Sequence, residues 1–461
     1  MCSTRIAGTS KLDGGPRLAA MSAATASRVS PARRVAYDVV RSTFEDGAHT
    51  DRALRAEAAR AGLEGRELAF ATRLAYETVQ RRRTLDAVIG ELAGRDVERL
   101  DAPVLAALRL GVLQLAFLDG VADHAAVDQA VQLAKAAGRG HGLVNAVLRR
   151  AAGEARSRIA AMPDDTPEAA ALRHSHPDWV ARLWWDAIGA DEARALMAAN
   201  NEPAETAVRV NTLVADPAMV AERTGGRRVN GIGEGLVLER VPALGAELMP
   251  QSRASMAVAR ALAPRPGERV LDLCAAPGAK ATHLAALMED RGQVIAVERD
   301  PARADELRAT CARLHAGCVD VRVADAREPV GGEAFDRVLV DPPCSGLGTL
   351  QARPDLRWRV RIADLDGLAA RQAAILDAAA AVLRPGGTLV YSTCTLSPRE
   401  NEDQVAALIE RRPDLEVDDL HADLPLWEHP DVPRFLQTMP HRDGTAGFFV
   451  ARLRRGVRGS Q

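Results

Sequence analysis

The sequence lacks any run of about 18 consecutive apolar residues, and it has no surplus of either charge. The missing apolar run argues against a membrane-spanning helix. Its 60 basic and 62 acidic residues give a formal net charge of −2, which excludes a globally polycationic nucleic-acid binder but not a local basic groove. Residues 1–30 are polar and lack the apolar segment of a secretory signal, so we expect an unstructured tail and a cytoplasmic protein. Met21 is a second candidate for the first residue.

Cysteine is sparse and lysine sparser. The six cysteines include no CxxC pair, which predicts neither a metal site nor a disulfide framework and fits a reducing compartment. Only three of the 60 basic residues are lysines, so arginine is used almost throughout and a single arginine is a weak indicator of function. The cysteines are Cys2, Cys274, Cys311, Cys318, Cys344 and Cys394.

The first large segment, 31–152, has a helical pattern throughout. Apolar residues recur there at three- and four-residue spacing, with Gly and Asp between the periodic stretches. This predicts an all-α domain, in a chain whose 461 residues suggest about three domains. The charged, proline-containing segment 153–173 is the predicted interdomain linker. Helices are expected at 32–44, 66–80, 83–92, 102–117 and 125–137.

The remainder changes from helices to an α/β pattern. We expect a small α/β connector at 174–265, with two short helices, strands at 206–213 and 235–239, and a tryptophan cluster (Trp179, Trp184, Trp185) that packs against something. From 266 to 455 strands alternate with helices, which predicts a mostly parallel, Rossmann-like sheet with helices on both faces, followed by a short tail at 456–461. Its strands are expected at 269–274, 294–298, 319–324, 337–341, 388–393 and 448–453.

The first strand of that sheet leads into a candidate ligand loop. The segment VLDLCAAPGAK, 270–280, is an apolar strand followed by a tight turn of small residues and a helix. Small residues let a ligand approach closely, and the free amides of a helix N-terminus favour a carboxylate or phosphate. The absence of GxGxxG speaks against a dinucleotide. An ordinary strand–turn–helix corner is the alternative for this motif alone.

Acidic residues end the next two strands. Glu298 can hydrogen-bond a ribose diol, and Asp325 can accept a hydrogen bond from an adenine amino group. Either acid alone would more often be a solvated strand end. Together with the loop after the first strand, they predict a pocket for an adenosine-containing ligand at the carboxyl edge of the sheet.

Two further strand ends carry cysteines. Cys344 lies in DPPCSG (341–346), where two prolines stiffen the loop, and Cys394 lies in YSTCTLSP (391–398). Beyond the second motif, Ser397 and Glu400 have the spacing of a capping box for the next helix. Each cysteine alone is best interpreted as a buried small hydrophobe. As a pair beside an adenosine pocket they indicate thiolate chemistry, because a thiolate can add to carbon 6 of a pyrimidine, make carbon 5 reactive, and later depart.

At these residues the sequence resembles the RNA 5-methylcytosine methyltransferases of the Nop/Sun family. The motifs LDLCAAPGAK, VER, ADAR, DPPCSGLGT and YSTCTLSPRENE occur in order within 266–455. The helical segment 31–152, ending in HGLVNAVLRR, is similar to the NusB antitermination factor, which implies an RNA-binding domain. The resemblance further implies S-adenosylmethionine as cofactor, 16S rRNA in an unfolded or early assembly state as substrate, and a monomer.

The resemblance also implies roles for individual residues. Cys394 would be the nucleophile, and Cys344 would assist release of the methylated base. Ala279 stands where the family usually has Gly, and Arg399 replaces a frequent Glu. The implied S-adenosylmethionine-binding residues are Cys274, Ala275, Ala276, Pro277, Gly278, Ala279, Lys280, Glu298, Asp325 and Asp341.

The substrate is less closely defined by the sequence than the chemistry. A tRNA cytosine-C5 methyltransferase would use the same active site, and a non-enzymatic RNA-binding ribosome assembly factor is a third hypothesis. Five arginines are predicted phosphate contacts, although each is about as readily a solvated surface charge. These are Arg209, Arg253, Arg353, Arg357 and Arg359.

Overall fold

The computed structural model describes residues 29–240, 244–328 and 334–457. The predicted tail at 1–30 therefore lies almost entirely outside the described residues, as does most of the tail at 456–461. The chain forms two compact units: residues 1–164 with 172–175, and residues 165–171 with 176–461. Within the part of the chain that the structure describes, no helix combines the length and the apolar character needed to cross a membrane.

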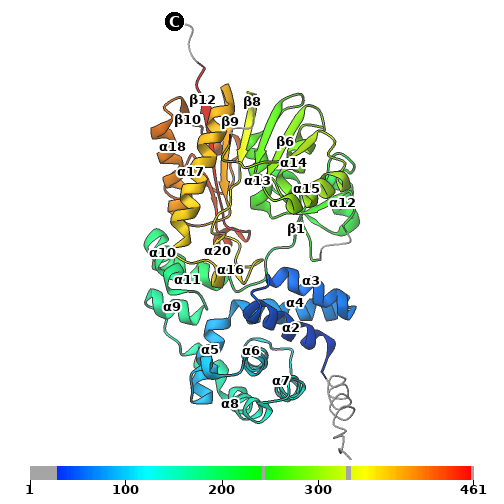
Figure 1. The fold of residues 1–461 in the computed structure, drawn as a ribbon, viewed down its shortest axis with the longest axis vertical. Helices are drawn as coiled ribbons and strands as arrows, with labels where there is room; N and C mark the ends of the chain where they lie inside the picture. The colour runs from blue at the N-terminus through cyan, green and yellow to red at the C-terminus, as the bar shows by residue number, and fades with distance from the viewer. Residues whose placement is uncertain (1–28, 241–243, 329–333, 458–461) are drawn as a thin grey trace, which may run out of the picture. The chain divides into compact units, whose positions relative to one another are not determined.

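The first unit is helical, as the periodicity predicts. Its centre is α6 (Ala102–Phe117), which packs against α2, α4, α5, α7 and α8 (Figure 1). This position accounts for a helix that is apolar on all sides. Among the described residues of this unit, the helices expected from the sequence did not include α3, which has few large apolar residues, or α8. The other helices are α2 (Pro31–Glu45), α3 (Thr50–Ala61), α4 (Gly65–Gln80), α5 (Arg82–Ala93), α7 (Asp123–Ala136) and α8 (His141–Ala160), with the short turn η1 (Val97–Arg99).

The segment predicted as the interdomain linker, 153–173, is largely helical. Helix α8 continues to Ala160, and α9 occupies Pro167–Arg173. The charges that suggested a linker lie on an exposed helix face, where Arg158 bonds to Glu154 one turn earlier and to Glu91 of α5. Such pairs at a four-residue spacing stabilise a helix, but in sequence they resemble a solvated connection.

The second unit is built on a large, mostly parallel sheet. Strands β7, β6, β5, β8 and β9 are parallel in that spatial order, and β12 continues the sheet antiparallel to β9. The chain runs outward from β5 to β7 and returns to β8 beside β5, which creates a switch point between β5 and β8. Open α/β sheets bind ligands at the carboxyl ends of strands at such a point. The strands are β5 (Arg269–Leu273), β6 (Gln293–Glu298), β7 (Val319–Val323), β8 (Phe335–Val340), β9 (Leu383–Thr393) and β12 (Phe448–Arg455), with short β10 (Leu415–Val417) and β11 (Leu436–Thr438) paired to β12.

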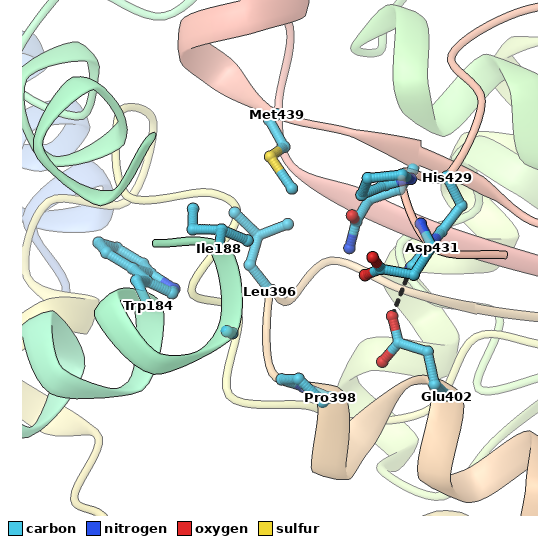
Figure 2. Close-up of a pocket in the computed structure, with 11 residues that line it drawn as sticks. Trp184, Ile188, Leu396, Pro398, Glu402, His429, Asp431 and Met439 are labelled. Carbon is cyan, nitrogen blue, oxygen red and sulfur yellow. Dashed lines mark hydrogen bonds and ion pairs between the residues drawn. The ribbon is translucent and has the colours of Figure 1, made fainter. Parts of the chain in front are cut away.

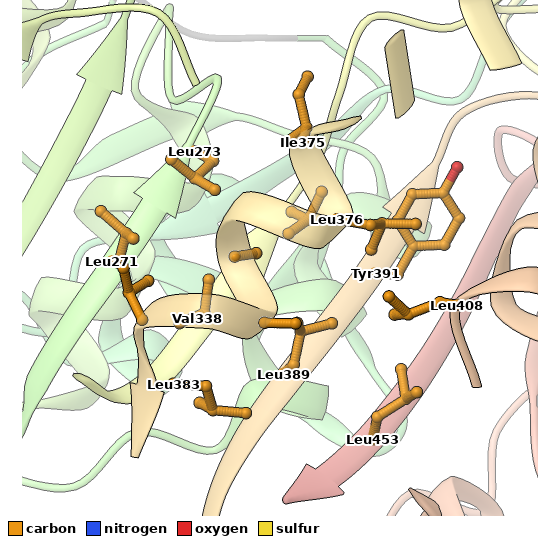
Figure 3. Packing of buried hydrophobic residues seen from close by; sticks show 14 of the residues in the cluster. Leu271, Leu273, Val338, Ile375, Leu376, Leu383, Leu389, Tyr391, Leu408 and Leu453 are labelled. Atoms are coloured by element: carbon orange, nitrogen blue, oxygen red, sulfur yellow. The ribbon is translucent and has the colours of Figure 1, made fainter. Parts of the chain in front are cut away.

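Helices cover both faces of this sheet (Figure 1). On one side lie α13 (Arg253–Leu262), α14 (Ala279–Leu287) and α15 (Pro301–Arg313), and on the other lie α17 (Asp364–Val382) and α18 (Glu402–Arg411). Figure 3 shows side chains of α17, among them Ile375 and Leu376, facing the leucines and valines of the central strands. The predicted fold class, a helical domain followed by a Rossmann-like α/β domain, is confirmed.

The connector contains two helices and a second, smaller sheet. Its helices are α10 (Asp178–Ile188) and α11 (Ala190–Ala199), and its antiparallel sheet has the order β2-β3-β1-β4 beside α12 (Pro217–Thr224). The predicted packing of the tryptophan cluster is confirmed: Trp184 is buried against Leu347, Leu350 and Leu396 of the loops that follow β8 and β9. The small strands are β1 (Ala207–Val210), β2 (Arg227–Val229), β3 (Ile232–Val237) and β4 (Leu248–Pro250), and short helices α16 (Leu356–Arg359), α19 (Leu420–Asp423) and α20 (Pro440–Asp443) complete the unit.

Two of the predicted phosphate contacts are wrong. Arg209 and Arg357 are fully buried. Arg209 donates to Gln251 and to Thr282 of α14, so it attaches the small sheet to the helix after β5. Arg357 donates to the side chain of Asn201 and the carbonyl of Asn200. An arginine side chain has a long apolar stem and several hydrogen-bond donors, so it can be buried or bind RNA. The sequence alone does not distinguish these two cases.

One acid in the central strand is buried without a partner. Asp272 of β5 is 1% exposed, and neither of its carboxylate oxygens has a hydrogen-bond partner among the described residues. Burial and, to a smaller extent, the negative charge of Asp341 raise the pKa of Asp272 to about 8, although the positive charge of Lys280 opposes them. Asp272 is therefore a neutral acid below that pH, since an ionised carboxylate there would be costly.

This burial predicts a pH dependence of stability. Between about pH 4 and pH 8 folded Asp272 keeps a proton that the unfolded chain, with a pKa of about 3.9, has released. The folded state binds more protons, so stability falls as pH rises through this window, by up to about 1.4 kcal/mol per pH unit. Asp272→Asn should remove that slope.

Urea unfolding followed by tryptophan fluorescence measures this, because all five tryptophans lie in the second unit. Asp320→Asn, the same change at an exposed position of β7, is the control and should retain the wild-type slope. Identical pH profiles for wild type and Asp272→Asn would contradict the assignment.

Candidate active site

The two motif cysteines meet at the carboxyl edge of the sheet. Strands β8 and β9 are parallel neighbours with Val340 paired to Tyr391, so the loops that follow them leave the sheet side by side. The Sγ atoms of Cys344 and Cys394 lie 3.4 Å apart, and both residues are partly buried. The sequence predicted a shared edge, and the structure brings the two sulfurs into hydrogen-bond contact.

The surroundings distinguish the two thiols. A hydrogen bond from Cys344 lowers the pKa of Cys394; burial opposes this, and the positive charges of Arg353 and Lys280 reinforce it. The pKa of Cys344 is raised well above its usual value by the same hydrogen bond, by burial, and by the negative charges of Glu400 and Asp341. The lowered pKa of Cys394 and the raised pKa of Cys344 favour the thiolate form at Cys394 and the thiol form at Cys344.

A buried ion pair lies beside the cysteines. Lys280 Nζ is 2.6 Å from Asp341 Oδ2, and Ser392 Oγ donates to the other carboxylate oxygen at 3.0 Å. Burial lowers the pKa of Lys280, but the Asp341 carboxylate more than offsets it, so the pKa is raised and the ammonium is kept. The sequence placed both residues among the cofactor-binding groups, and their pairing across β5 and β8 is a finding of the structure.

The loop after β5 presents a free helix N-terminus. Helix α14 begins at Ala279 with Gly278 as its N-cap, and Gly278 supplies no side-chain oxygen to the first-turn amides. Those amides are therefore available to an anion. Gly278 has φ 105°, and a Cβ there would lie 2.8 Å from Leu307, so both the backbone and the packing require glycine. Burial and nearby acids raise the pKa of Cys274 to about 12, so this third cysteine is an unreactive thiol.

The two predicted nucleoside acids lie at the ends of β6 and β7. Glu298 is 5% exposed, accepts the amide of Asp300 at 2.9 Å, and lies 3.3 Å from Arg303. Arg303 also bonds to the carbonyl of Ala276 at 3.0 Å, which links Glu298 to the loop after β5. Asp325 is less buried, and Arg327 bonds to both of its oxygens, which holds the pKa of Asp325 well below its usual range. Glu298 is thus linked to the loop through Arg303, whereas both carboxylate oxygens of Asp325 already bond to Arg327.

The predicted capping box is wrong. Ser397 makes no cap, and α18 begins at Glu402, after the turn η2 (Pro398–Glu400). Glu400 is fully buried and accepts hydrogen bonds from Ser345 rather than from the backbone of Ser397. A capping box is a local pattern, and here a tertiary partner takes the carboxylate. Glu400, like Asp272, is a site residue that the sequence analysis missed.

The remaining predicted phosphate contacts differ in their surroundings. Arg253 forms an ion pair with Glu205, and Arg359 forms one with Asp355. Arg353 is exposed, and its charge acts on Cys394, which makes it the member of the set best placed to meet a substrate.

A small pocket lies behind the segment that follows Cys394. Figure 2 shows Trp184 and Ile188 of α10 on one side, Leu396 in front of them, and His429 and Glu402 opposite. His429 Nδ1 accepts two backbone amides, so the proton is on Nε2, which donates to Glu402 at 2.6 Å. This pair attaches the loop 429–432 to α18, and no motif in the sequence indicated it.

Comparisons with known proteins agree with this geometry. Residues 259–454 match the family described as 16S rRNA methyltransferase RsmB/F, residues 30–153 match the NusB family, and residues 176–230 match an RsmF/B-like ferredoxin-like domain. The chain is 34% identical to the probable ribosomal RNA small subunit methyltransferase B of Bacillus subtilis, over 83% of this chain and 90% of that protein. It is 37% identical to the ribosomal RNA small subunit methyltransferase B of Thermus thermophilus, over 88% and 92%.

Two solved structures are similar to this chain in fold. The crystal structure of the protein PH0851 matches with a TM-score of 0.76 and 27% identity, covering 92% of this chain and 99% of that one. A methyltransferase homologue from Pyrococcus horikoshii matches with a TM-score of 0.56 and 28% identity, over 64% of this chain and all of that one. The two curated relatives match this chain over about nine-tenths of their own length. The protein therefore belongs to the RsmB (Sun) family of ribosomal RNA small subunit methyltransferases.

Proposed function

We propose that the protein transfers a methyl group from S-adenosylmethionine to carbon 5 of a cytosine in 16S rRNA. The observation that carries this proposal is the contact between the Cys344 thiol and the Cys394 thiolate, beside a loop suited to an adenosine ligand. The names of the relatives, ribosomal RNA small subunit methyltransferase B, support the choice of substrate.

The residues around the loop after β5 fit the methyl donor. The uncapped first turn of α14 suits its carboxylate, and the buried Glu298 suits its ribose hydroxyls. Asp325 would share its oxygens between Arg327 and the adenine amino group. Residues 274–280 supply the backbone of the pocket, with Lys280 held by Asp341 at its inner end. When bound, S-adenosylmethionine supplies an electrophilic methyl group.

Cys394 makes the pyrimidine reactive. Its thiolate adds to carbon 6 of the cytosine and forms a sulfur–carbon bond, and the electron pair of the carbon 5–carbon 6 double bond becomes available at carbon 5. Carbon 5 then bonds to the methyl carbon of the donor while the bond from that carbon to the sulfonium sulfur breaks, and its electron pair stays on sulfur as a neutral thioether. Arg353 and Lys280 favour the thiolate before this attack, since both place positive charge near it.

Cys344 assists the elimination that releases the methylated base from Cys394. After methylation the proton on carbon 5 is lost, and the electron pair left there re-forms the double bond and expels Cys394 as a thiolate. The Cys344 thiol lies 3.4 Å away and donates a hydrogen bond to this leaving sulfur. The contact that stabilises the thiolate before attack therefore stabilises it again on departure.

The RNA must present an unstacked base. A cytosine inside a duplex does not reach a pocket of this kind, which favours loops or rRNA that is still unfolded in early assembly. The exposed Arg353 offers one phosphate contact next to Cys394. We assign the NusB-like unit to RNA binding. We further propose that the protein acts as a monomer in the cytoplasm.

Removal of the nucleophile gives the first test. Cys394→Ala should reduce methyl transfer by about 10⁴-fold or more, because the neighbouring Cys344 has a raised pKa and supplies little thiolate to add to carbon 6. Affinity for S-adenosylmethionine, measured by calorimetry, should stay within twofold of wild type. Cys318→Ala, which changes a cysteine away from the two motifs, is the matched control. Substantial residual transfer by Cys394→Ala would refute the covalent mechanism.

Removal of the second thiol should trap the adduct. Cys344→Ala deprives the leaving sulfur of its hydrogen-bond donor, whereas Arg353 and Lys280 still favour the attacking thiolate, so a covalent protein–RNA complex should accumulate. A slow-migrating band on a denaturing gel detects it. The double variant Cys344→Ala/Cys394→Ala should show no such band, and normal turnover without any adduct would remove Cys344 from the mechanism.

Mapping the 5-methylcytosine that depends on this protein identifies its RNA substrate. Deleting the gene should abolish one 5-methylcytosine in 16S rRNA and leave those in tRNA unchanged, as measured by bisulfite sequencing of both RNA classes. Loss of a tRNA mark instead would indicate the tRNA enzyme. Full complementation by a Cys394→Ala chain would favour the assembly-factor hypothesis.

A further inference from the structure

The buried carboxylate of Glu400 contacts the loop that carries Cys344. It accepts hydrogen bonds from the backbone amide of Ser345 at 2.9 Å, from Ser345 Oγ at 2.5 Å and from Gln372 Nε2 at 3.1 Å. Ser345 directly follows Cys344 in the chain. Glu400 is fully buried, and none of the ion pairs among the described residues includes it. A buried carboxylate needs such donors, so the position of Ser345 is bound to that of Glu400.

The next residue contacts both sides of Cys394. Asn401 Oδ1 accepts a hydrogen bond from Thr393 Oγ1 at 2.5 Å, and its Nδ2 donates to the carbonyl of Thr395 at 3.1 Å. Asn401 is 1% exposed. Two consecutive residues of one turn thus hold the immediate neighbours of the two cysteines, Glu400 on one loop and Asn401 on the other.

The two loops are also bonded to each other and to the sheet. Ser345 Oγ and Thr395 Oγ1 lie 2.6 Å apart, and because Ser345 gives its hydroxyl hydrogen to Glu400, Thr395 is the donor in that pair. The Tyr391 hydroxyl of β9 donates to the Glu400 carbonyl at 2.6 Å, which fixes the turn against the strand. The turn therefore has no freedom to move without breaking several buried hydrogen bonds.

A second contact restrains Cys394 from the opposite direction. The amide of Gly348, in the loop after Cys344, donates to the carbonyl of Cys394 at 3.0 Å, and Gly348 in turn accepts from the amide of Gly447 at 2.7 Å. A Cβ on Gly348 would lie 2.0 Å from the Gly447 carbonyl oxygen, so the approach requires glycine. The negative charge of Glu400 also raises the pKa of Cys344, which suits a thiol that must remain a donor.

We propose that Glu400 and Asn401 are positioning residues that set the distance between the Cys344 and Cys394 sulfurs by holding one cysteine loop each. Neither residue touches the reacting base in this assignment. The effect of the sulfur–sulfur distance on catalysis rests on the proposed function, whereas the effect of Glu400 and Asn401 on that distance can be tested without it. Glu400→Gln tests this arrangement. The amide nitrogen of the glutamine is a hydrogen-bond donor and would face the donors of Ser345 or Gln372, so at least one of these hydrogen bonds would be lost.

The test measures the geometry of the sulfurs without RNA or cofactor. Diamide, an azo oxidant, accepts two electrons and two protons from a pair of nearby thiols and leaves a disulfide between them. In wild type the 3.4 Å separation should give rapid Cys344–Cys394 disulfide formation, measured by mass spectrometry of the linked peptides. Glu400→Gln should slow this reaction about 10-fold or more.

The same variant should lower kcat by a similar factor, while KM for RNA and affinity for S-adenosylmethionine stay within twofold. Glu402→Gln is the matched control: it lies two residues on, bonds to His429, and contacts neither cysteine loop, so all four quantities should match wild type. Wild-type disulfide rates and kcat in folded Glu400→Gln would overturn the proposal.

Two further outcomes are assigned in advance. If Glu400→Gln does not fold, Ser345→Ala, which removes only the hydroxyl donor, decides: slower disulfide formation supports the proposal and an unchanged rate overturns it. If Cys394→Ala retains methyl transfer, the covalent mechanism fails, but a slowed disulfide in Glu400→Gln would still establish that Glu400 positions the sulfurs.

Discussion

The contact between the two sulfur atoms is the interaction on which the rest of the site depends. It exists because β8 and β9 are parallel neighbours, so their carboxyl ends release two loops at the same edge of the sheet. A thiolate and a thiol in contact share one proton, and the charges around them decide which sulfur keeps it. Their mutual hydrogen bond, the cations Arg353 and Lys280 near Cys394 and the carboxylate of Glu400 near Cys344 shift the pKa values of the two chemically identical side chains in opposite directions.

Several groups that do not react make this contact possible. The turn at Glu400 and Asn401 restrains the loops from one side, and the glycine contact between Gly348 and Gly447 restrains them from another. The connector adds an apolar support, since Trp184 packs against leucines of both cysteine loops. A small domain whose similarity is to a ferredoxin-like fold therefore contributes to the active site through packing, in addition to any contact with RNA.

The ionisable groups near the switch point of the sheet also depend on the partners around them. Lys280 and Asp341 satisfy each other, and Ser392 completes the carboxylate, so this pair is compatible with burial. Asp272 lies nearby without a hydrogen-bond partner among the described residues, and burial together with the negative charge of Asp341 raises its pKa.

The sequence by itself determined much of this protein. Periodicity and motif order predicted the helical unit, the Rossmann-like sheet with its main strands, and the placement of Cys344, Cys394, Glu298 and the loop after β5 at one edge. Those features are encoded locally, because hydrophobic period and turn residues act over a few neighbours. Only the tertiary structure decided the contacts between distant segments. It paired Lys280 with Asp341, buried Arg209 and Arg357, and turned Glu400 from a helix cap toward Ser345, 55 residues earlier in the chain. A buried carboxylate or guanidinium takes whichever donors or acceptors the fold brings to it, and local sequence does not contain that information.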